Sequence, residues 1–253
     1  MVEESRIWPE PENESAKSNE GQKSLFIRAG VILVVLLIGL ALMLPALQSP
    51  REIVTKRDCS TNLRLIGLAL HNYHETYGSL PPAYTVDAQG KRLHSWRTLI
   101  LPFLDQQALY DKINLGKPWD DPANAEVRAT TVRCYACPVA ELPPGYTTYL
   151  AVVGENFCFH PTRGRKLSEI TDNHHETVAV FETDKDHAVY WMAPDDGDPS
   201  LSLEFDDKLA KAHAGKIFVL MAGGSLQYLK TELTPETRKA LMTIAGGETV
   251  GEF

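Results

Sequence analysis

The chain has 253 residues, of which 43% are hydrophobic and 23% charged, and its formal net charge is −8. This composition is typical of a globular protein and excludes a collagen, a disulfide-dense miniprotein and a wholly disordered chain. The acidic balance also argues against a nucleic-acid partner, because sequence-independent binding needs lysine and arginine side chains that neutralise phosphates.

The first segment, residues 1–24, is predicted to be a disordered tail. It is rich in Glu, Ser, Asn and Pro, and Ile7 and Trp8 are its main large apolar side chains. A segment with so little apolar surface cannot bury a core, so we expect it to stay unfolded.

An apolar segment follows and predicts a transmembrane helix over residues 25–47. No charged side chain occurs from residue 29 to residue 47, and a helix of that length extends about 28 Å, close to the thickness of a bilayer's hydrocarbon core. A cleaved signal peptide is disfavoured by the acidic tail and by the lack of a small-x-small cleavage site. A buried core helix is disfavoured because the run has no polar face. Basic side chains on the two sides are nearly balanced and leave the orientation open.

Residues 48–253 are predicted to form one soluble domain that begins with helices. Apolar side chains three and four residues apart, from Leu63 to Tyr77, predict an amphipathic helix that ends at Gly78. A second helical region is predicted over residues 95–113, with a break or a first-turn position at Pro102.

Short runs rich in Val, Tyr, Phe and Thr predict strands in the second half of this domain. They cover residues 147–153, 177–181, 187–192, 216–221 and 225–229. Gly223 and Gly224 between the last two runs predict a hairpin with a two-residue turn, and Thr234 before Pro235 predicts the start of a short last helix. Helices followed by antiparallel strands are typical of the α+β class.

Several segments together resemble one known family. They are LMLPALQSPRE (42–52), CSTNLRLIGLALHNYHETYGSLPPA (59–83), residues 95–124, VRCYACP (132–138), TTYLAVVG (147–154) and residues 167–182. His213 and Gly223-Gly224 then follow at the spacing of a closing H-x9-D-G signature. Over roughly residues 25–230 the chain is similar to the planctomycete domain-of-unknown-function 1559 family, whose members resemble type II secretion pseudopilins.

The resemblance implies a pilin-like α+β fold, in which a long N-terminal helix packs on an antiparallel β-sheet and its first half spans the membrane. It also implies a cytoplasmic tail and an extracytoplasmic domain over residues 48–253, with the lipid bilayer, through residues 25–47, and envelope proteins as partners. No catalytic activity and no cofactor are attached to the family.

The chain departs from the pilin pattern at the processing site. Lys23 stands where pilin-like members have the Gly before the cleavage point, Ser24 follows it, and Arg28 stands where they have a Glu. We therefore expect no peptidase processing and no fibre assembly through that carboxylate. At the other end, Gly223 stands in place of the signature Asp, and we expect His213 to order the final hairpin around Gly223 and Gly224.

The four cysteines are Cys59, Cys134, Cys137 and Cys158. In an exported domain an even number of cysteines is expected to pair, and four cysteines allow three pairings. The family-like positions of Cys59 and Cys137 favour that pair, which leaves Cys134 with Cys158. A zinc site at Cys134 and Cys137 lacks a second pair of ligands at similar spacing.

Other titratable clusters are interpreted as structural, so we expect no metal site and no catalytic residue. His71 and His74 share a helix face with Glu75 beside them, and the resemblance implies that this helix packs on the sheet. His174 and His175 fall in a turn before a strand. The acidic loop lacks the EF-hand spacing of a calcium site. Its members are Asp184, Asp186, Asp195, Asp196 and Asp198.

The expected function is a structural or protein-interaction role without catalysis. One alternative is a binding module for a small molecule or glycan, with an aromatic pocket near Trp96, Trp119 and Trp191. A second alternative is a metal-dependent hydrolase that uses His71, His74 and nearby acids.

Overall fold

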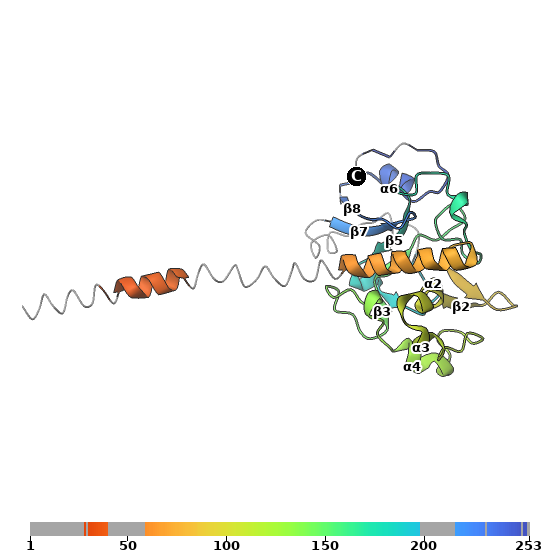
Figure 1. Ribbon diagram of the computed structural model, residues 1–253, viewed down its shortest axis with the longest axis horizontal. Coiled ribbons are helices and arrows are strands. Elements are labelled where there is room, and N and C mark those ends of the chain that lie inside the picture. The colour runs from red at the N-terminus through yellow and green to blue at the C-terminus, as the bar shows by residue number, and fades with distance from the viewer. Residues whose placement is uncertain are drawn as a thin grey trace, which may run out of the picture. The chain divides into compact units, whose positions relative to one another are not determined.

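The computed structural model describes residues 28, 30–39, 59–197, 216–230, 232–248 and 250–251. The chain divides into two units, Met1–Ile53 and Val54–Phe253, which are described separately (Figure 1). In the first unit, residues 30–39 form a helix, and all of them are exposed.

The predicted transmembrane helix over residues 25–47 is contradicted, and with it the single-pass location with an extracytoplasmic domain. The lipid bilayer as a partner stays a prediction. Among the described residues, no helix combines the length and the apolar character needed to cross a membrane. Residues 40–47, like the predicted tail 1–24, lie outside the described residues.

The second unit begins with a helix over residues 59–77, which confirms the predicted amphipathic helix. Leu63 and Ile66 are fully buried on one face, whereas Leu65 and Leu68 on the other face are 44% and 58% exposed. The helix ends because Gly78 takes a left-handed conformation, with φ of 75°, and its N–H donates to the carbonyl of His74. Glycine adopts this capping geometry without strain.

The helical region predicted over residues 95–113 consists of short elements, and Pro102 occupies a first-turn position in it, as predicted. Asp105 takes a left-handed φ of 56° directly after the turn that holds Pro102, so helical geometry cannot continue across it. Before this region, β1 (Tyr84–Val86) and β2 (Arg92–Ser95) form an antiparallel pair. The short α-helices are α2 (Trp96–Leu99), α3 (Gln107–Tyr110) and α4 (Ala125–Arg128). The 3-10 turns are η1 (Leu101–Leu104), η2 (Pro122–Asn124) and η3 (Arg133–Tyr135).

The largest described sheet has four antiparallel strands in the order β4-β5-β7-β8. These are β4 (Tyr149–Ala151), β5 (Val178–Glu182), β7 (Lys216–Met221) and β8 (Leu226–Lys230). A separate two-stranded sheet pairs β3 (Tyr146–Thr147) with β6 (Val189–Tyr190). The 3-10 turn η4 (Leu167–Glu169) lies between β4 and β5 in the chain, and η5 (Lys185–His187) lies between β5 and β6. Each of the five predicted strand segments overlaps a strand, because the apolar and β-branched runs fit a buried sheet.

The predicted pilin-like fold is wrong. The described residues form short helices and several separate antiparallel sheets, and they show no long apolar N-terminal helix. The helical residues 30–39 and 59–77 belong to different units. The prediction joined two helical patterns on either side of Pro50 into one element, and residues 40–58 between them lie outside the described residues.

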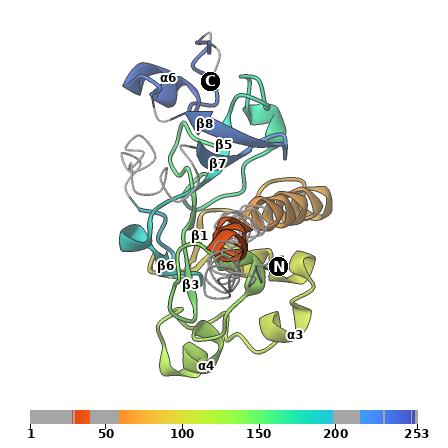
Figure 2. The same ribbon diagram turned by 90° about the vertical axis from the view of Figure 1, so that its left-hand side faces the viewer.

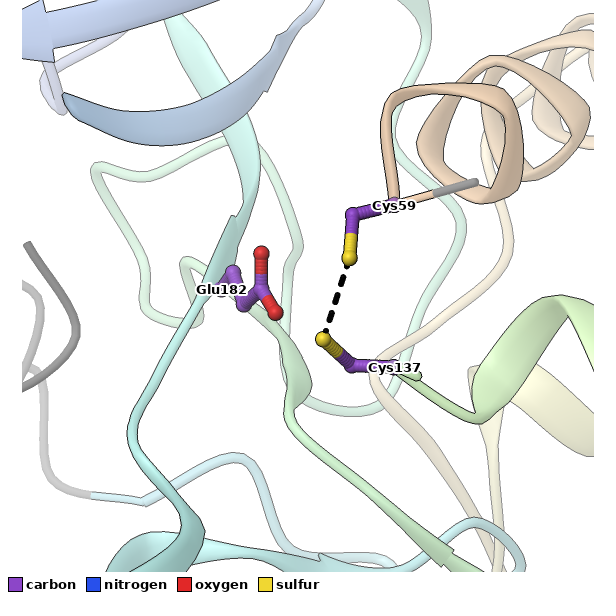
Figure 3. Close-up of side chains that lie close together, drawn as sticks. All are labelled: Cys59, Cys137 and Glu182. Carbon is purple, nitrogen blue, oxygen red and sulfur yellow. Dashed lines mark hydrogen bonds between the residues drawn. The ribbon is translucent and has the colours of Figure 1, made fainter. Parts of the chain in front are cut away.

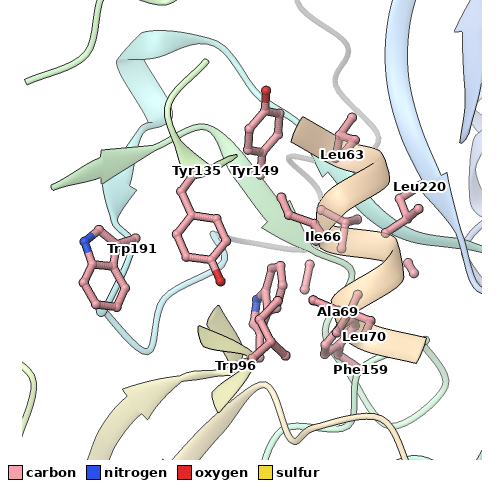
Figure 4. Packing of buried hydrophobic residues seen from close by; sticks show 14 of the residues in the cluster. Leu63, Ile66, Ala69, Leu70, Trp96, Tyr135, Tyr149, Phe159, Trp191 and Leu220 are labelled. Atoms are coloured by element: carbon pink, nitrogen blue, oxygen red, sulfur yellow. The ribbon is translucent and has the colours of Figure 1, made fainter. Parts of the chain in front are cut away.

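Two apolar clusters form the core of the second unit and cover both faces of the sheet. In β7, Ile217 and Val219 point into one cluster with Leu241 and Met242. Leu220 points into the other cluster, which also holds Leu63, Ile66, Leu70, Trp96, Tyr135, Tyr149, Phe159 and Trp191 (Figure 4). This alternation follows from the two-residue period of a strand.

The last helix, α6 (Pro235–Ala240), begins as predicted. The Thr234 side chain accepts a hydrogen bond from the backbone N–H of Thr237, and Pro235 occupies the first turn. Leu241 and Met242 directly after α6 belong to the apolar cluster with β7 and β8, and Figure 2 shows α6 beside these strands.

The β7–β8 hairpin forms where Gly223 and Gly224 predict it, but its turn is longer than predicted. The N–H of Gly224 donates to the carbonyl of Met221, and the N–H of Met221 donates to the carbonyl of Ser225. Gly224 has a φ of 80°. This is the three-residue turn in which the last position is left-handed, so Gly224 rather than Gly223 needs to be glycine.

Candidate functional site

Two thiols meet in the core of the second unit. Cys59 is the first described residue of the helix over 59–77, and Cys137 follows η3 (Figure 3). The Sγ atom of Cys59 lies 3.2 Å from the Sγ atom of Cys137. The two residues are 0% and 3% exposed, and all four cysteines are thiols in this structure. The predicted pairing of Cys59 with Cys137 thus has its two sulfur atoms in contact and stays a prediction.

A buried carboxylate accompanies the two thiols. Glu182 ends strand β5 and is 1% exposed. One of its oxygens and the two sulfur atoms all lie within 4.8 Å of one another. Thiolates and a carboxylate are also the ligand types of zinc, but a structural zinc site takes four ligands. We call Cys59, Cys137 and Glu182 the thiol site.

Hydrogen bonds hold the two sides of the thiol site together. The side-chain amide of Asn62, one turn along the helix, donates to the carbonyl of Ala136 at 3.1 Å. Tyr149 of β4 is fully buried beside the site. Desolvation, and then the negative charge of Glu182 and of the nearby cysteines, raises the pKa of Tyr149 well above its ordinary value. The phenol therefore stays protonated and neutral.

The other two cysteines are buried away from this contact. Cys134 is 7% exposed and Cys158 is 0% exposed. Burial raises the pKa of each thiol to about 12. The thiolate is the reactive form of cysteine, so both side chains are inert as nucleophiles.

A second buried polar cluster surrounds Asp196. Its carboxylate pairs with the guanidinium of Arg97, accepts from the Trp96 indole at 3.0 Å, and accepts from the backbone N–H of Ala151 at 2.8 Å. Burial raises the pKa of Asp196, and the Arg97 charge acts against that rise. The cluster fastens the segment after β6 to α2 and β4.

The acidic side chains predicted as a solvated loop have separate structural roles. Asp184 caps η5 by accepting from the N–H groups of Asp186 and His187. Asp195 accepts from the N–H of Gly197, and Asp196 points inward to Arg97. Asp198 lies outside the described residues. The described members do not converge on one cation site.

The histidines on the helix are separated in their contacts. A Cβ atom on Gly224 would lie 2.7 Å from the His71 ring, so His71 packs directly against the hairpin turn. His74 lies 3.9 Å from the carboxylate of Glu75. In the described part of the chain, the group with metal-ligand spacing is the thiol site, which contains neither histidine.

The histidines of the predicted turn also contact the hairpin. The carbonyl of His174 accepts from the N–H of Gly223 at 2.9 Å, and the His175 ring lies 3.4 Å from the hydroxyl of Ser225. These contacts hold the glycines of the signature in place. His213, predicted to do so, lies outside the described residues, as do Lys23 and Ser24 of the processing site; Arg28 is described and exposed.

The three tryptophans of the aromatic-pocket alternative do not share an accessible face. Trp96 and Trp191 are fully buried, and the Trp191 indole donates to the carbonyl of Thr130. Trp119 is half-buried and its ring packs on Tyr190 with centroids 5.4 Å apart. A ligand therefore has no surface of Trp96 or Trp191 on which to stack.

Sequence reasoning missed Glu182, Arg97 and Asn62. Glu182 follows an apolar strand run, and a charged residue beside such a run is the signal that could have marked it. Arg97 and Asn62 fall within helical patterns, where polar side chains usually face solvent. Only the tertiary packing turns them inward.

Comparison with known proteins gives one match. The family model described as Protein of unknown function (DUF1559) matches residues 48–151. No curated protein matches the chain, and no solved structure does. The matched stretch is shorter than residues 25–230, over which the sequence resembles the family. It contains Cys59 and Cys137 but not Glu182. The match does not bear on the pseudopilin likeness. Over residues 48–151 the chain thus matches the DUF1559 family of proteins of unknown function.

Proposed function

We propose that this chain is a non-catalytic structural or protein-interaction protein, and that its four-stranded sheet accepts an extended segment of a partner protein along β8. The observation that carries the proposal is the position of β8 at the end of the sheet order. Among the described strands, β7 is the one neighbour of β8. A strand edge recognises an extended segment by main-chain hydrogen bonds.

The register of the hairpin supports this use of β8. Met221 donates to Ser225 across the turn, and Leu220 pairs with Leu226, Val219 with Gln227 and Phe218 with Tyr228. Hydrogen-bonded and non-hydrogen-bonded pairs alternate in an antiparallel ladder. The backbone groups of Leu226, Tyr228 and Lys230 therefore point away from β7, toward the edge.

The exposed fractions of the β8 side chains agree with β8 as an edge strand. Leu229 is buried, whereas Tyr228 is 50% exposed and Lys230 is exposed. Both faces of β7 contribute to apolar clusters, so an added strand would extend the sheet in its own plane.

The buried polar groups support a role without catalysis. Arg97 and Asp196 neutralise each other out of contact with solvent, and the thiols of Cys134 and Cys158 are held in the unreactive form by burial. A substrate has no access to these groups while the core stays packed.

The test compares Lys230→Pro with Lys230→Ala in quantitative crosslinking from intact cells. Lys230 is exposed, and proline removes its backbone N–H, which points to the edge, whereas alanine keeps the N–H and removes only the side chain. Proteins captured by the wild type and by Lys230→Ala but lost with Lys230→Pro would support the proposal. Equal capture by both variants, with circular dichroism showing both folded, would overturn it.

A further inference from the structure

The thiol site places two cysteines from distant parts of the chain in direct contact. Their Sγ atoms lie 3.2 Å apart and the residues are 78 positions apart in sequence. Figure 3 shows the two side chains pointing toward each other from the helix over 59–77 and from the segment after η3. Small side-chain rotations bring two such sulfur atoms to the bonded distance of about 2.05 Å.

The backbone segments that carry the thiols are held together independently of the sulfur atoms. Asn62 on the helix donates to Ala136, the residue before Cys137, at 3.1 Å. Cys59 and Asn62 are 0% and 7% exposed, so this junction lies in the packed core. Two reacting groups fixed in this way meet at a high effective concentration, which favours bond formation between them over reaction with other thiols.

A neutral product suits this environment better than a bound cation. A zinc ion held by two thiolates and the Glu182 carboxylate would leave one net negative charge in a site whose members are at most 3% exposed, and burying charge is costly unless it is fully compensated. A structural zinc ion also requires a fourth ligand. A disulfide carries no charge and leaves no polar hydrogen unsatisfied.

The remaining cysteines differ from this pair in their contacts. Among the described residues, the sulfur atoms in contact are those of Cys59 and Cys137, whereas Cys134 and Cys158 are buried apart as free thiols. Burial also raises the pKa of Cys134 and of Cys158 to about 12, which disfavours the thiolate that attacks a disulfide. We infer that Cys59 and Cys137 form a disulfide in an oxidising environment while Cys134 and Cys158 stay thiols.

The bond forms by thiol–disulfide exchange with a low-molecular-weight disulfide, RS–SR. One protein thiol loses its proton and attacks RS–SR, which gives a mixed disulfide and releases RS⁻. The second protein thiolate then attacks the mixed disulfide at the protein sulfur and releases the second RS⁻. The protein loses two protons and two electrons, and the reagent is reduced to two RSH.

The experiment counts thiols in the purified full chain after equilibration with oxidised glutathione. The native protein is freed of reagent, unfolded in the presence of an alkylating agent, and weighed intact by mass spectrometry. We expect two alkylated thiols in the wild type, three in Cys59→Ala and in Cys137→Ala, and one in the matched controls Cys134→Ala and Cys158→Ala. A glutathione adduct, visible as added mass, is counted as an unclosed thiol.

Other counts would overturn the inference. Four thiols in the wild type would mean that no bond forms, and one thiol in Cys59→Ala would mean that the other cysteines pair. Stoichiometric zinc in the reduced wild type that protects Cys59 and Cys137 from alkylation would assign the site to a metal instead.

A measurement on the wild type alone avoids the risk that a variant fails to fold. Trypsin cuts after Arg57, Arg64, Arg133 and Arg163, so Cys59 lies on peptide 58–64 and the other three cysteines on peptide 134–163. A linked pair of these two peptides with two alkylated cysteines is expected, and fragmentation must place the link at Cys137. A link at Cys134 or Cys158 would contradict the inference.

Discussion

Arg97 and Asp196 form an ion pair in which the two side chains are 0% and 4% exposed. The pair also anchors Trp96, whose indole donates to Asp196 at 3.0 Å, and β4, since the guanidinium of Arg97 donates to the carbonyl of Tyr149 at 2.9 Å. The segment after β6, helix α2 and strand β4 are thus held together around the Asp196 carboxylate.

Asp196→Ala is predicted to lower the free energy of unfolding by about 3–5 kcal/mol, because it leaves the Arg97 charge buried without its partner. Urea denaturation followed by tryptophan fluorescence measures the change. The control is Asp184→Ala, which removes the cap of η5 and is expected to cost about 1 kcal/mol. Similar losses in both variants would contradict this account of Asp196.

Gly224→Ala is predicted to destabilise the protein more than Gly90→Ala does. The two glycines have φ values of 80° and 81°, so alanine meets the same backbone strain, about 1–2 kcal/mol, at either position. At Gly224 the new Cβ would also lie 2.7 Å from the His71 ring. A Cβ added at Gly90 would have no neighbouring atom within 4 Å.

The difference between these variants isolates the contact with the hairpin. We expect Gly224→Ala to lose about 1 kcal/mol more than Gly90→Ala, as overpacking does. In a His71→Ala background this excess should disappear, and its persistence would show that the His71 contact is not the cause. Thermal and urea unfolding of the wild type, the two glycine variants, His71→Ala and the two double variants provide the comparison.

The stability of the protein is predicted to fall as the pH drops below about 6.5, through His94. Desolvation lowers the pKa of this buried imidazole below its ordinary value of 6.5, against the effect of backbone hydrogen bonds at Lys117 and Asn114. Below pH 6.5 the unfolded chain therefore binds a proton that the folded state resists, and the free energy of unfolding decreases toward the folded pKa.

Urea denaturation from pH 7.5 to pH 5 tests this prediction. His94→Gln should flatten the pH dependence relative to the wild type. An equal slope in the wild type and in His94→Gln would assign the acid sensitivity to other groups.

Closure of the bond between Cys59 and Cys137 is predicted to raise the free energy of unfolding by about 4.5 kcal/mol, the value of the chain-entropy model for a loop of this length. Denaturation with and without a strong reductant measures it. Cys59→Ala should show no dependence on the reductant. A wild type with the same midpoint in both conditions would contradict the prediction.

Local patterns predicted the elements whose buried side chains repeat regularly. The helix from Leu63 to Tyr77 and the strands around Val180 and Val219 follow from their periods, and the capping pair Thr234-Pro235 starts α6 as expected. The helical region over residues 95–113 was predicted with its first-turn proline at Pro102, but its second interruption, where Asp105 turns left-handed, carries no comparable signal in the sequence.

The site depended on packing that no local pattern encodes. The meeting of Cys59 with Cys137 was suggested by family-like positions and not by spacing, and Glu182 joins them only because β5 ends beside the helix. The inward turn of Asp196 is also tertiary, since its neighbours Asp195 and Gly197 are exposed. The pilin-like fold was implied by the family resemblance and the membrane span by the uncharged run over residues 29–47, and no helix of the described residues supports the span.

The junction at Asn62 and Ala136 has a mechanical consequence. It lies beside the contact of Cys59 with Cys137, at the point where the chain enters the helix over residues 59–77. With the sulfur atoms bonded, tension on the chain before residue 59 passes directly to residue 137 and on toward β4. Residues 60–136, which include β1, β2 and α2 to α4, then carry no tension and keep their structure. The tension acts on the four-stranded sheet instead.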